Sequence, residues 1–577
     1  MKNSLIKRYF PASQWLPSYN RSWLAADAIA GMTVWGLIVP QAMAYAGVAG
    51  LPPQFGLYTL LVSLFLYALL GTSRHLVLQP TSATSALIAS SVTTVLVATG
   101  IVASGADIDP AIYQQYALAF VLVVGVVFLV AGIARLGWIT QFLSKPVLDG
   151  FVTGLAVFVL VGQLHKIFGV QKGSGNTVQK FLTILRELPE TNLTTFAMGA
   201  GALILLFLLP KWNRKIPAGL IVLFGSIALS AALSLESNYG VNVVGEIPQG
   251  LPSLDLTLVP LPAMLAMIPL AIGVLLVAFS QTLGTARQFA DEHNYEIDPN
   301  QELMASGLPS IVSSLAGGMI AGGSMSASAV NEGAGSRSQV SNLFAWGATI
   351  LTVLFLTPIF QSLPEAVLAA LIIRAVWNIV AQGKLRYARR VSRAEFTLGV
   401  LTFAGVILID VLPGMLIGVI SAVLLTIYQS TRPHVSNLGR VPHVTGAYLD
   451  MTRHPESVPV PGILIFRLDA PLYYANAITV RDRFMQFIKQ ADPKPKAVLI
   501  DASIQDNLDI TSAEMLKSLI KLIRNQGIEI YFAEVHSPVL EFSSITGLLD
   551  LLDEDHLFPT VDMAVREIEK SFTREGT

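Results

Sequence analysis

Two short polar runs have the residue types needed to bind an anion, because each breaks an apolar stretch and opens a new one. Residues 79–85 read Gln-Pro-Thr-Ser-Ala-Thr-Ser, and residues 317–326 are rich in glycine and serine. Proline in the first turn and serine or threonine at the cap are typical of helix starts. We therefore predict that a helix begins at each run.

A helix that begins inside a membrane leaves backbone donors to be satisfied. Each N-terminus carries about half a positive charge and several unpaired N–H groups, which must face protein, water or a ligand at membrane depth. Two starts that converge would hold an anion without a basic side chain. The alternative is that glycine and serine only let helices pack closely.

Membrane-spanning helices are the elements that must position these runs. Of 577 residues, 53% are hydrophobic and 13% are charged, and the mean hydropathy is +0.61. Windows able to cross a hydrocarbon core of about 30 Å recur up to about residue 430. About fourteen can be placed, at 24–46, 54–71, 81–97, 113–134, 138–164, 193–210, 216–235, 262–283, 302–320, 325–341, 343–362, 365–381, 394–411 and 413–430.

The windows form two sets of seven around a linker at residues 236–261. Because seven is odd, the two sets would have opposite orientations, as in transporters built from inverted repeats. Each polar run takes the third place in its set, where this symmetry would bring the two helix starts face to face. This equivalent position of the two polar runs favours an anion site over the alternative that glycine and serine only let helices pack closely.

Basic residues predict the orientation, since lysine and arginine favour the cytoplasmic side. An internal N-terminus puts Arg74, Arg135 and the basic stretch 384–393 inside, although the external loop 166–192 also holds basic residues. We expect an integral protein of the cell (inner) membrane with both termini cytoplasmic. Its predicted parts are an N-terminal segment (1–23), a transmembrane domain (24–432) and a C-terminal domain (433–577).

The remaining composition narrows the function. A formal net charge of −1 gives no case for a nucleic-acid partner, and the lack of cysteine excludes disulfides and thiolate chemistry. The C-terminal domain reads as a small α/β domain, with strands at 463–468, 497–501 and 527–533 and helices at 478–490 and 512–525. It shows no phosphate-binding loop and no metal-type spacing, so we expect no enzymatic activity, cofactor or metal.

Several motifs resemble the sulfate permease (SulP) family. They are Ala-Gly-Met-Thr-Val at 30–34, Pro-Gln-Ala-Met-Ala-Tyr-Ala at 40–46, Ala-Gly-Leu-Pro-Pro at 49–53, Gly-Leu-Tyr at 56–58, Gly-Thr-Ser-Arg-His at 71–75, Asp-Pro-Asn-Gln-Glu-Leu at 298–303, and Ser-Met-Ser at 324–326 leading to Ala-Val-Asn at 329–331. The run Phe-Arg-Leu-Asp-Ala-Pro-Leu-Tyr-Tyr-Ala-Asn at 466–476 resembles the STAS domain of that family. The resemblance covers nearly the whole chain.

The resemblance implies an α-helical polytopic membrane protein of about fourteen segments in 7+7 inverted repeats. It also implies core and gate domains, elevator-like movement, a cytoplasmic STAS domain, and usually a homodimer in the lipid bilayer. The family places a small inorganic or carboxylate anion between the starts of segments 3 and 10. The residues that would line this site by position are Gln41, Tyr45, Pro80, Thr81, Ser82, Met325, Ser326 and Ala327.

Departures from the family pattern bear on the substrate. Gln79 and Thr81 stand where the family often has glycine and an aromatic residue, Ala327 follows the segment 10 serine where arginine is common, and Gln281 replaces an acidic coupling residue. Two helix ends supply about one positive charge, which balances a monovalent anion but not a divalent one. Chloride, bicarbonate or a monocarboxylate is therefore a candidate beside sulfate, and exchange or uncoupled flux is favoured over proton coupling at Gln281.

Other polar residues leave alternatives open. Glu332 and Arg337 on segment 10 could be functional or structural, and Arg374 could attract anions or bind a backbone carbonyl. His75 and His165 at segment ends are interpreted as interfacial residues. Thr511 and Ser512 could be regulatory phosphorylation sites, or Thr511 could form a capping box with Glu514.

Three other functions are alternatives to the interpretation as an anion transporter. One is a dicarboxylate/proton symporter, and another is an anion or voltage sensor that signals to a protein partner through the STAS domain. The third is a nucleobase permease, which would need a carboxylate to hold base edges where this chain has Gln281.

Overall fold

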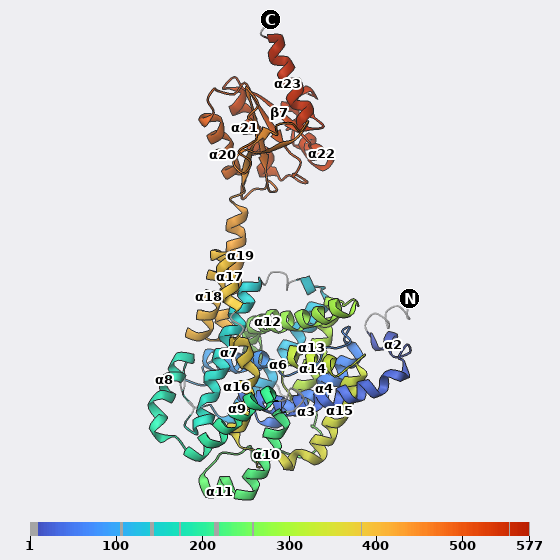
Figure 1. Cartoon of the computed structure of the whole chain (residues 1–577), viewed down its shortest axis with the longest axis vertical. Coiled ribbons are helices and arrows are strands. Elements are labelled where there is room, and N and C mark those ends of the chain that lie inside the picture. The colour runs from blue at the N-terminus through green and yellow to red at the C-terminus, as the bar shows by residue number, and fades with distance from the viewer. Residues whose placement is uncertain are drawn as a thin grey trace. The chain divides into compact units, whose positions relative to one another are not determined.

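The computed structural model describes residues 10–103, 108–138, 144–171, 173, 175–212, 218–256, 259–381, 384–552 and 554–575. Contacts divide the chain into two compact units, residues 1–422 and 423–577 (Figure 1). Some predicted regions lie partly outside the described residues: the N-terminal segment, the windows at 138–164 and 216–235, the loop 166–192, the linker 236–261 and the C-terminal domain. The predicted domain limits stay predictions.

The chain is helical up to Ser430, and every apolar window overlaps a helix within the described residues. The first set comprises α3 (Leu24–Val48), α4 (Pro53–Leu70), α5 (Ser82–Ala98), α6 (Pro110–Ile133), α7 (Lys145–Phe168), α9 (Leu193–Trp212) and α10 (Ala218–Leu233). The second set comprises α12 (Leu261–His293), α13 (Pro299–Leu315), α14 (Met325–Gly333), α15 (Val340–Leu351), α16 (Glu365–Ala381), α18 (Arg393–Leu408) and α19 (Val411–Ser430). Short helices lie between and before them: α2 (Ala12–Trp15), α8 (Thr177–Glu187), α11 (Leu235–Tyr239) and α17 (Lys384–Val391).

Eight helices among the described residues are long and apolar enough to cross a membrane by length and composition. Two of the shorter apolar helices are α5 and α10. The helical polytopic fold is thereby confirmed, and the count of about fourteen crossings stays a prediction.

Contacts between the two sets repeat with the sets exchanged. The first helix of one set packs against the fourth of the other in both α3–α15 and α12–α6. The second helix of one set packs against the fourth of the other in both α4–α15 and α13–α6. The first helix of one set packs against the third of the other in both α3–α14 and α12–α5. Two intertwined repeats have this pattern, as the division into two sets predicted.

Several predicted boundaries are wrong. The helix expected to run from 325 to 341 ends at Gly333, and α15 begins only at Val340. Gly335, with a φ of 93°, breaks the helix there. Asp27 of α3 then holds the connecting backbone, because its carboxylate accepts from the N–H groups of Arg337 and Ser338 at 2.6 and 3.3 Å. α12 is longer than expected and continues to His293.

The second unit is an α/β domain built on one six-stranded sheet in the order β4-β3-β5-β6-β7-β8. Its strands are β3 (Val435–Arg440), β4 (Tyr448–Asp450), β5 (Ile463–Leu468), β6 (Ala497–Asp501), β7 (Glu529–Ala533) and β8 (Leu557–Phe558). Its helices are α20 (Ala477–Gln490), α21 (Ile510–Arg524), α22 (Ser537–Thr546) and α23 (Val561–Glu575). The strands and helices predicted from sequence are confirmed within two residues at each end.

The alternation of apolar residues along β5 explains the two layers of this domain. Phe466 and Leu468 pack into one core with residues of α20 and α21. Ile463 and Ile465 face the opposite core, which α23 covers. Successive side chains of a strand point to opposite faces, so one strand anchors both layers.

The predicted capping box at Thr511 is wrong. Asp509 is the N-cap of α21, and its carboxylate accepts from the Ser512 N–H at 2.8 Å. Ser512 is fully buried, while Thr511 is exposed in the first turn. A phosphorylation site in this loop would therefore have to be Thr511 unless the helix start opens.

Candidate anion-binding site

A two-stranded ribbon joins the starts of the two short helices. β1 (Leu78–Gln79) pairs antiparallel with β2 (Gly322–Gly323), with Leu78 opposite Gly323 and Gln79 opposite Gly322. α5 begins at Ser82 and α14 at Met325, directly after these strands. The ribbon therefore holds the two helix starts beside each other, with the chain running in opposite directions through them.

The start of α5 leaves two backbone donors free. Thr81 is the N-cap, and its hydroxyl oxygen accepts from the Thr84 N–H at 3.2 Å. The Thr84 hydroxyl oxygen accepts in turn from the Thr81 N–H at 3.0 Å. The N–H groups of Ser82 and Ala83 have no hydrogen-bond partner among the described residues. Pro80, which lacks an N–H, is buried next to the cap.

The start of α14 repeats this arrangement. Ser324 is the N-cap, and its hydroxyl oxygen accepts from the Ala327 N–H at 3.3 Å. The preceding turn is fixed because the Ser324 N–H donates to the Val77 carbonyl at 3.0 Å. The N–H groups of Met325 and Ser326 have no partner among the described residues. Their side chains are exposed, whereas Ala327 is fully buried.

One buried amide links the ribbon to α3 and α14. The Gln79 Nε2 donates to the Gln41 Oε1 at 3.1 Å and to the Ser324 hydroxyl at 3.0 Å. The Gln41 oxygen accepts this hydrogen bond, and its NH₂ group has no partner among the described residues. Sequence reasoning noted Gln79 only as a departure from a family pattern and missed this bridging position.

Two further helices enclose the helix starts. α3 packs against α5 and α14, and α12 packs against α5 and β2. On α12 the Thr282 hydroxyl accepts from the Gly323 N–H at 2.8 Å. Its neighbour Gln281 is half-buried, and Tyr45 on α3 is buried. The structure thus gathers the elements that carry the predicted lining residues, and Gln79 bonds Gln41 to the ribbon.

Arg374 lies in another part of the first unit. Its Nε donates to the Leu206 carbonyl at 3.3 Å, and its guanidinium lies 4.9 Å from the Phe207 ring centroid. Of the two roles that the sequence left open, the structure favours the contact with a backbone carbonyl.

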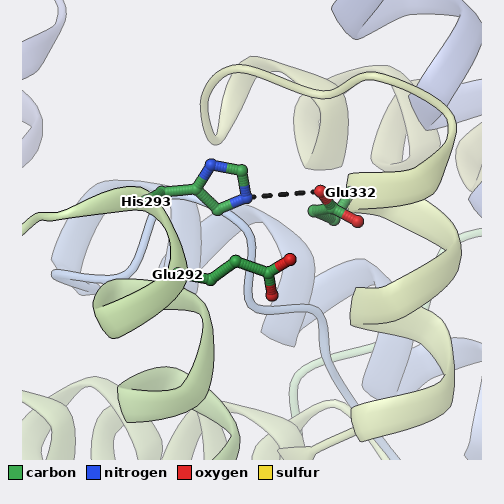
Figure 2. Close-up of side chains that lie close together, drawn as sticks. All are labelled: Glu292, His293 and Glu332. Carbon is green, nitrogen blue, oxygen red and sulfur yellow. Dashed lines mark ion pairs between the residues drawn. The ribbon is translucent and has the colours of Figure 1, made fainter.

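A second cluster of titratable groups lies where α12 ends against α14. Figure 2 shows Glu292, His293 and Glu332 converging, with 3.3 Å between the His293 Nε2 and the Glu332 Oε1. The His75 ring stacks on His293 with centroids 4.3 Å apart. His75 is buried among its neighbours, and its interpretation as an interfacial residue stays a prediction. Sequence spacing had compared Glu332 with Arg337 and could not reveal a partner on another helix.

The donor types of this cluster also suit a divalent cation. One ligand atom from each of the three residues lies within 4.8 Å of the others. No metal was expected from the sequence, where the cluster cannot be seen because it joins adjacent positions on α12 to a position on a different helix.

Taken together, the exchanged helix sets, the paired helix starts with free donors and the C-terminal α/β domain define a membrane anion transporter of the type that carries a STAS domain. Comparison with known families agrees. Residues 24–402 match the sulfate permease family and residues 454–564 match the STAS domain. The chain therefore belongs to the sulfate permease family.

Relatives cover almost the whole chain. A "Probable sulfate transporter MT1781" of Mycobacterium tuberculosis (strain CDC 1551 / Oshkosh) is 33% identical, with 96% of each chain covered. "Sulfate transporter 4.1, chloroplastic" of Arabidopsis thaliana is 28% identical over 97% of this chain and 82% of its own length.

Solved structures share the fold. The murine Slc26a9 anion transporter in its inward-facing state superposes with a TM-score of 0.90 at 24% identity, covering 98% of this chain and 95% of that chain. The transmembrane domain of the cyanobacterial bicarbonate transporter BicA gives a TM-score of 0.60 at 21% identity, covering 70% and 98%. These likenesses confirm the predicted helical membrane fold with a C-terminal STAS domain.

Proposed function

We propose that this protein carries small anions across the membrane by alternating access, with the anion held between the starts of α5 and α14. The observation that carries the proposal is the set of free N–H groups on Ser82, Ala83, Met325 and Ser326, at two helix starts joined by one ribbon. Donors at helix N-termini suit an anion through both hydrogen bonding and the helix dipole.

The substrate we propose is a monovalent anion such as bicarbonate or chloride. Two helix ends contribute about one positive charge, and position 327, where the family often has arginine, is a buried alanine. Uncompensated charge inside a membrane costs at least a few kcal/mol. The names of similar proteins include a divalent and a monovalent substrate. The relatives are called sulfate transporters, and BicA is called a bicarbonate transporter.

Uptake into proteoliposomes tests this substrate class. Saturable uptake of labelled bicarbonate or chloride, competed by the other anion and weakly by sulfate, is expected. Efficient sulfate uptake that excess chloride and bicarbonate leave unchanged would contradict the proposal.

The movement that we propose is elevator-like, within a homodimer. The two exchanged helix sets support it, because both helix starts are fixed to one ribbon and would move as one body. A cross-link that ties this body to the rest of the first unit should stop transport without abolishing anion binding.

A proton-coupled symporter is the second candidate, favoured by the His293–Glu332 pair. Gln281 cannot titrate, so coupling would have to pass through another group. If uptake depends steeply on a proton gradient, Glu332→Gln should remove that dependence while Gln281→Ala keeps it. A gradient dependence that survives Glu332→Gln would exclude this pair.

A further inference from the structure

A small pocket lies at the end of the first unit that the distribution of basic residues predicts to be cytoplasmic. Its volume is about 100 Å³, against roughly 10–15 Å³ needed to hold one water. The pocket lies between α2, the turn that follows it, the loop after α4 and the turn before α15. Its lining residues are Trp15, Ser18, Tyr19, Trp23, Gly71, Thr72, Ser73, Arg74, Arg337, Ser338 and Gln339.

Two buried carboxylates beside the pocket are already saturated with hydrogen bonds. Asp27 accepts from the backbone of Arg337, from the Ser338 N–H and hydroxyl, and from the Tyr19 hydroxyl at 3.0 Å. Glu302 accepts from the Thr72 N–H and hydroxyl at 2.7 and 2.6 Å, and from the Tyr67 hydroxyl at 2.8 Å. Their oxygens are therefore engaged by these donors.

The cationic side chains of the pocket, in contrast, lack an acceptor. Among the described residues, neither the Arg74 nor the Arg337 guanidinium has an ion pair or hydrogen bond, and Arg74 only lies over the Tyr295 ring at 5.2 Å. Both side chains are exposed. The Nε1 of Trp15 is buried in the wall and has no partner in the part of the chain that the structure describes. The pocket thus has a surplus of donors.

A ligand that only accepts hydrogen bonds and carries negative charge would complete this pocket. A guanidinium group can donate two parallel hydrogen bonds to the oxygens of a phosphate, as a bidentate pair. Tryptophans are typical of the membrane–water boundary, and the neighbouring Leu16 and Leu24 are 55% and 48% exposed, as side chains facing lipid would be. We propose that this pocket binds the phosphate group of an acidic phospholipid.

Several charged groups act on such a ligand. Arg74 and Arg337 attract it, while the charges of Asp27 and Glu302 weaken it. On the far side of His75 lies the ion pair of His293 with Glu332. Binding should accordingly be moderate and sensitive to salt, since exposed charges are screened.

Native mass spectrometry of the purified full-length protein tests the proposal. Phosphatidylglycerol should be retained more strongly than phosphatidylcholine. The double variant Arg74→Gln/Arg337→Gln should lose this preference by about tenfold or more, because it removes both charged hydrogen-bond donors of the pocket. The control Arg389→Gln/Arg390→Gln removes two exposed arginines of α17 and should have no effect.

A second probe identifies the source of the phosphate. Inorganic phosphate that displaces phosphatidylglycerol, or that binds alone with loss in the double variant, would assign the pocket to phosphate groups in general rather than to lipid. Equal retention of the two lipids, or lipid binding unchanged by the double variant, would overturn the proposal. If the double variant does not fold, Arg74→Gln compared with Arg74→Lys decides in its place.

Discussion

At the scale of residues, the candidate site depends on neutral donors rather than charged side chains. The Gln79 amide bridges Gln41 and Ser324, and the free N–H groups flank it on both sides. Such an arrangement is sensitive to single polar atoms, because a buried group that loses its partner costs about 1–3 kcal/mol. Because the donors are neutral, only the partial charges of the two helix ends, about one positive charge in total, balance the charge of the anion.

Gln79→Leu should weaken both stability and transport. Leucine leaves the Ser324 hydroxyl and the Gln41 oxygen without their donor, so we expect a loss of about 1–3 kcal/mol and a several-fold higher KM for uptake. Thermal unfolding and uptake kinetics check this. Thr93→Val on α5, the helix that follows β1, removes only a hydroxyl that is bonded to its own helix backbone, and it should behave as the parent protein does. Parent-like uptake in Gln79→Leu would contradict the bridging role.

Ser326→Arg should shift selectivity toward divalent anions. The position is exposed at the start of α14, and a guanidinium there would add a full positive charge to the roughly one charge of the helix ends. We expect the sulfate-to-bicarbonate ratio of kcat/KM to rise about tenfold, or about 1.4 kcal/mol. Ser326→Gln has a long side chain without charge; an equal rise in that variant would refute the electrostatic reading.

At the scale of elements, the β1–β2 ribbon is the feature that positions both helix starts. A methyl group at Gly323 would meet the Thr282 Cα at 2.7 Å, which is backbone of α12 and cannot simply rotate away. The ribbon was not predicted, because two residues per strand give no alternating pattern. The helices that it connects were predicted, since proline, threonine and serine at helix starts are strong local signals.

Gly323→Ala should disrupt the site, because Gly323 directly precedes Ser324, the N-cap of α14. The contact with Thr282 forces the ribbon or α12 to move, and we expect a destabilisation of about 1–3 kcal/mol together with loss of uptake. Gly333→Ala is the matched control in α14, because nothing lies within 4 Å of a methyl group there. Equal unfolding temperatures for the two variants would show that the close approach does not matter.

In the C-terminal domain, Asp450 couples stability to acid pH. Burial raises the pKa of its carboxyl, but hydrogen bonds from His434 and Thr452 outweigh burial and lower that pKa below its ordinary value. A lowered pKa means that the ionised form stabilises the fold, so this contribution is present above the ordinary pKa of about 3.9 and is lost as the pH falls through the lowered value. Asp450→Asn should therefore destabilise the domain at pH 7 and progressively less at strongly acid pH. Thermal unfolding over that range measures it, and a pH-independent difference would disprove the coupling.

At the scale of the whole molecule, hydropathy along the sequence predicted most of the fold but only part of the candidate site. Apolar windows placed the helices because lipid demands continuous apolar length. The division into two sets predicted their exchange. What the sequence could not show were partners brought together from distant helices, such as His293 with Glu332 or Asp27 with the backbone at Arg337. Those depend on packing that no local spacing records.

The central claim is that the carried anion lies at the starts of α5 and α14. The chain contains no cysteine, so Ser326→Cys introduces the sole thiol, on an exposed side chain at the proposed site. Gly333→Cys places a thiol at an exposed position at the far end of α14, where nothing lies within 4 Å of an added Cβ, as the control. Both variants must first retain saturable uptake.

The decisive measurement is the rate at which a small thiol reagent modifies these cysteines as the transported anion is added. We predict that the anion slows modification of Ser326→Cys, with half-protection near the KM for uptake, and leaves Gly333→Cys unaffected. Unchanged modification of Ser326→Cys at anion concentrations that saturate uptake would contradict the claim.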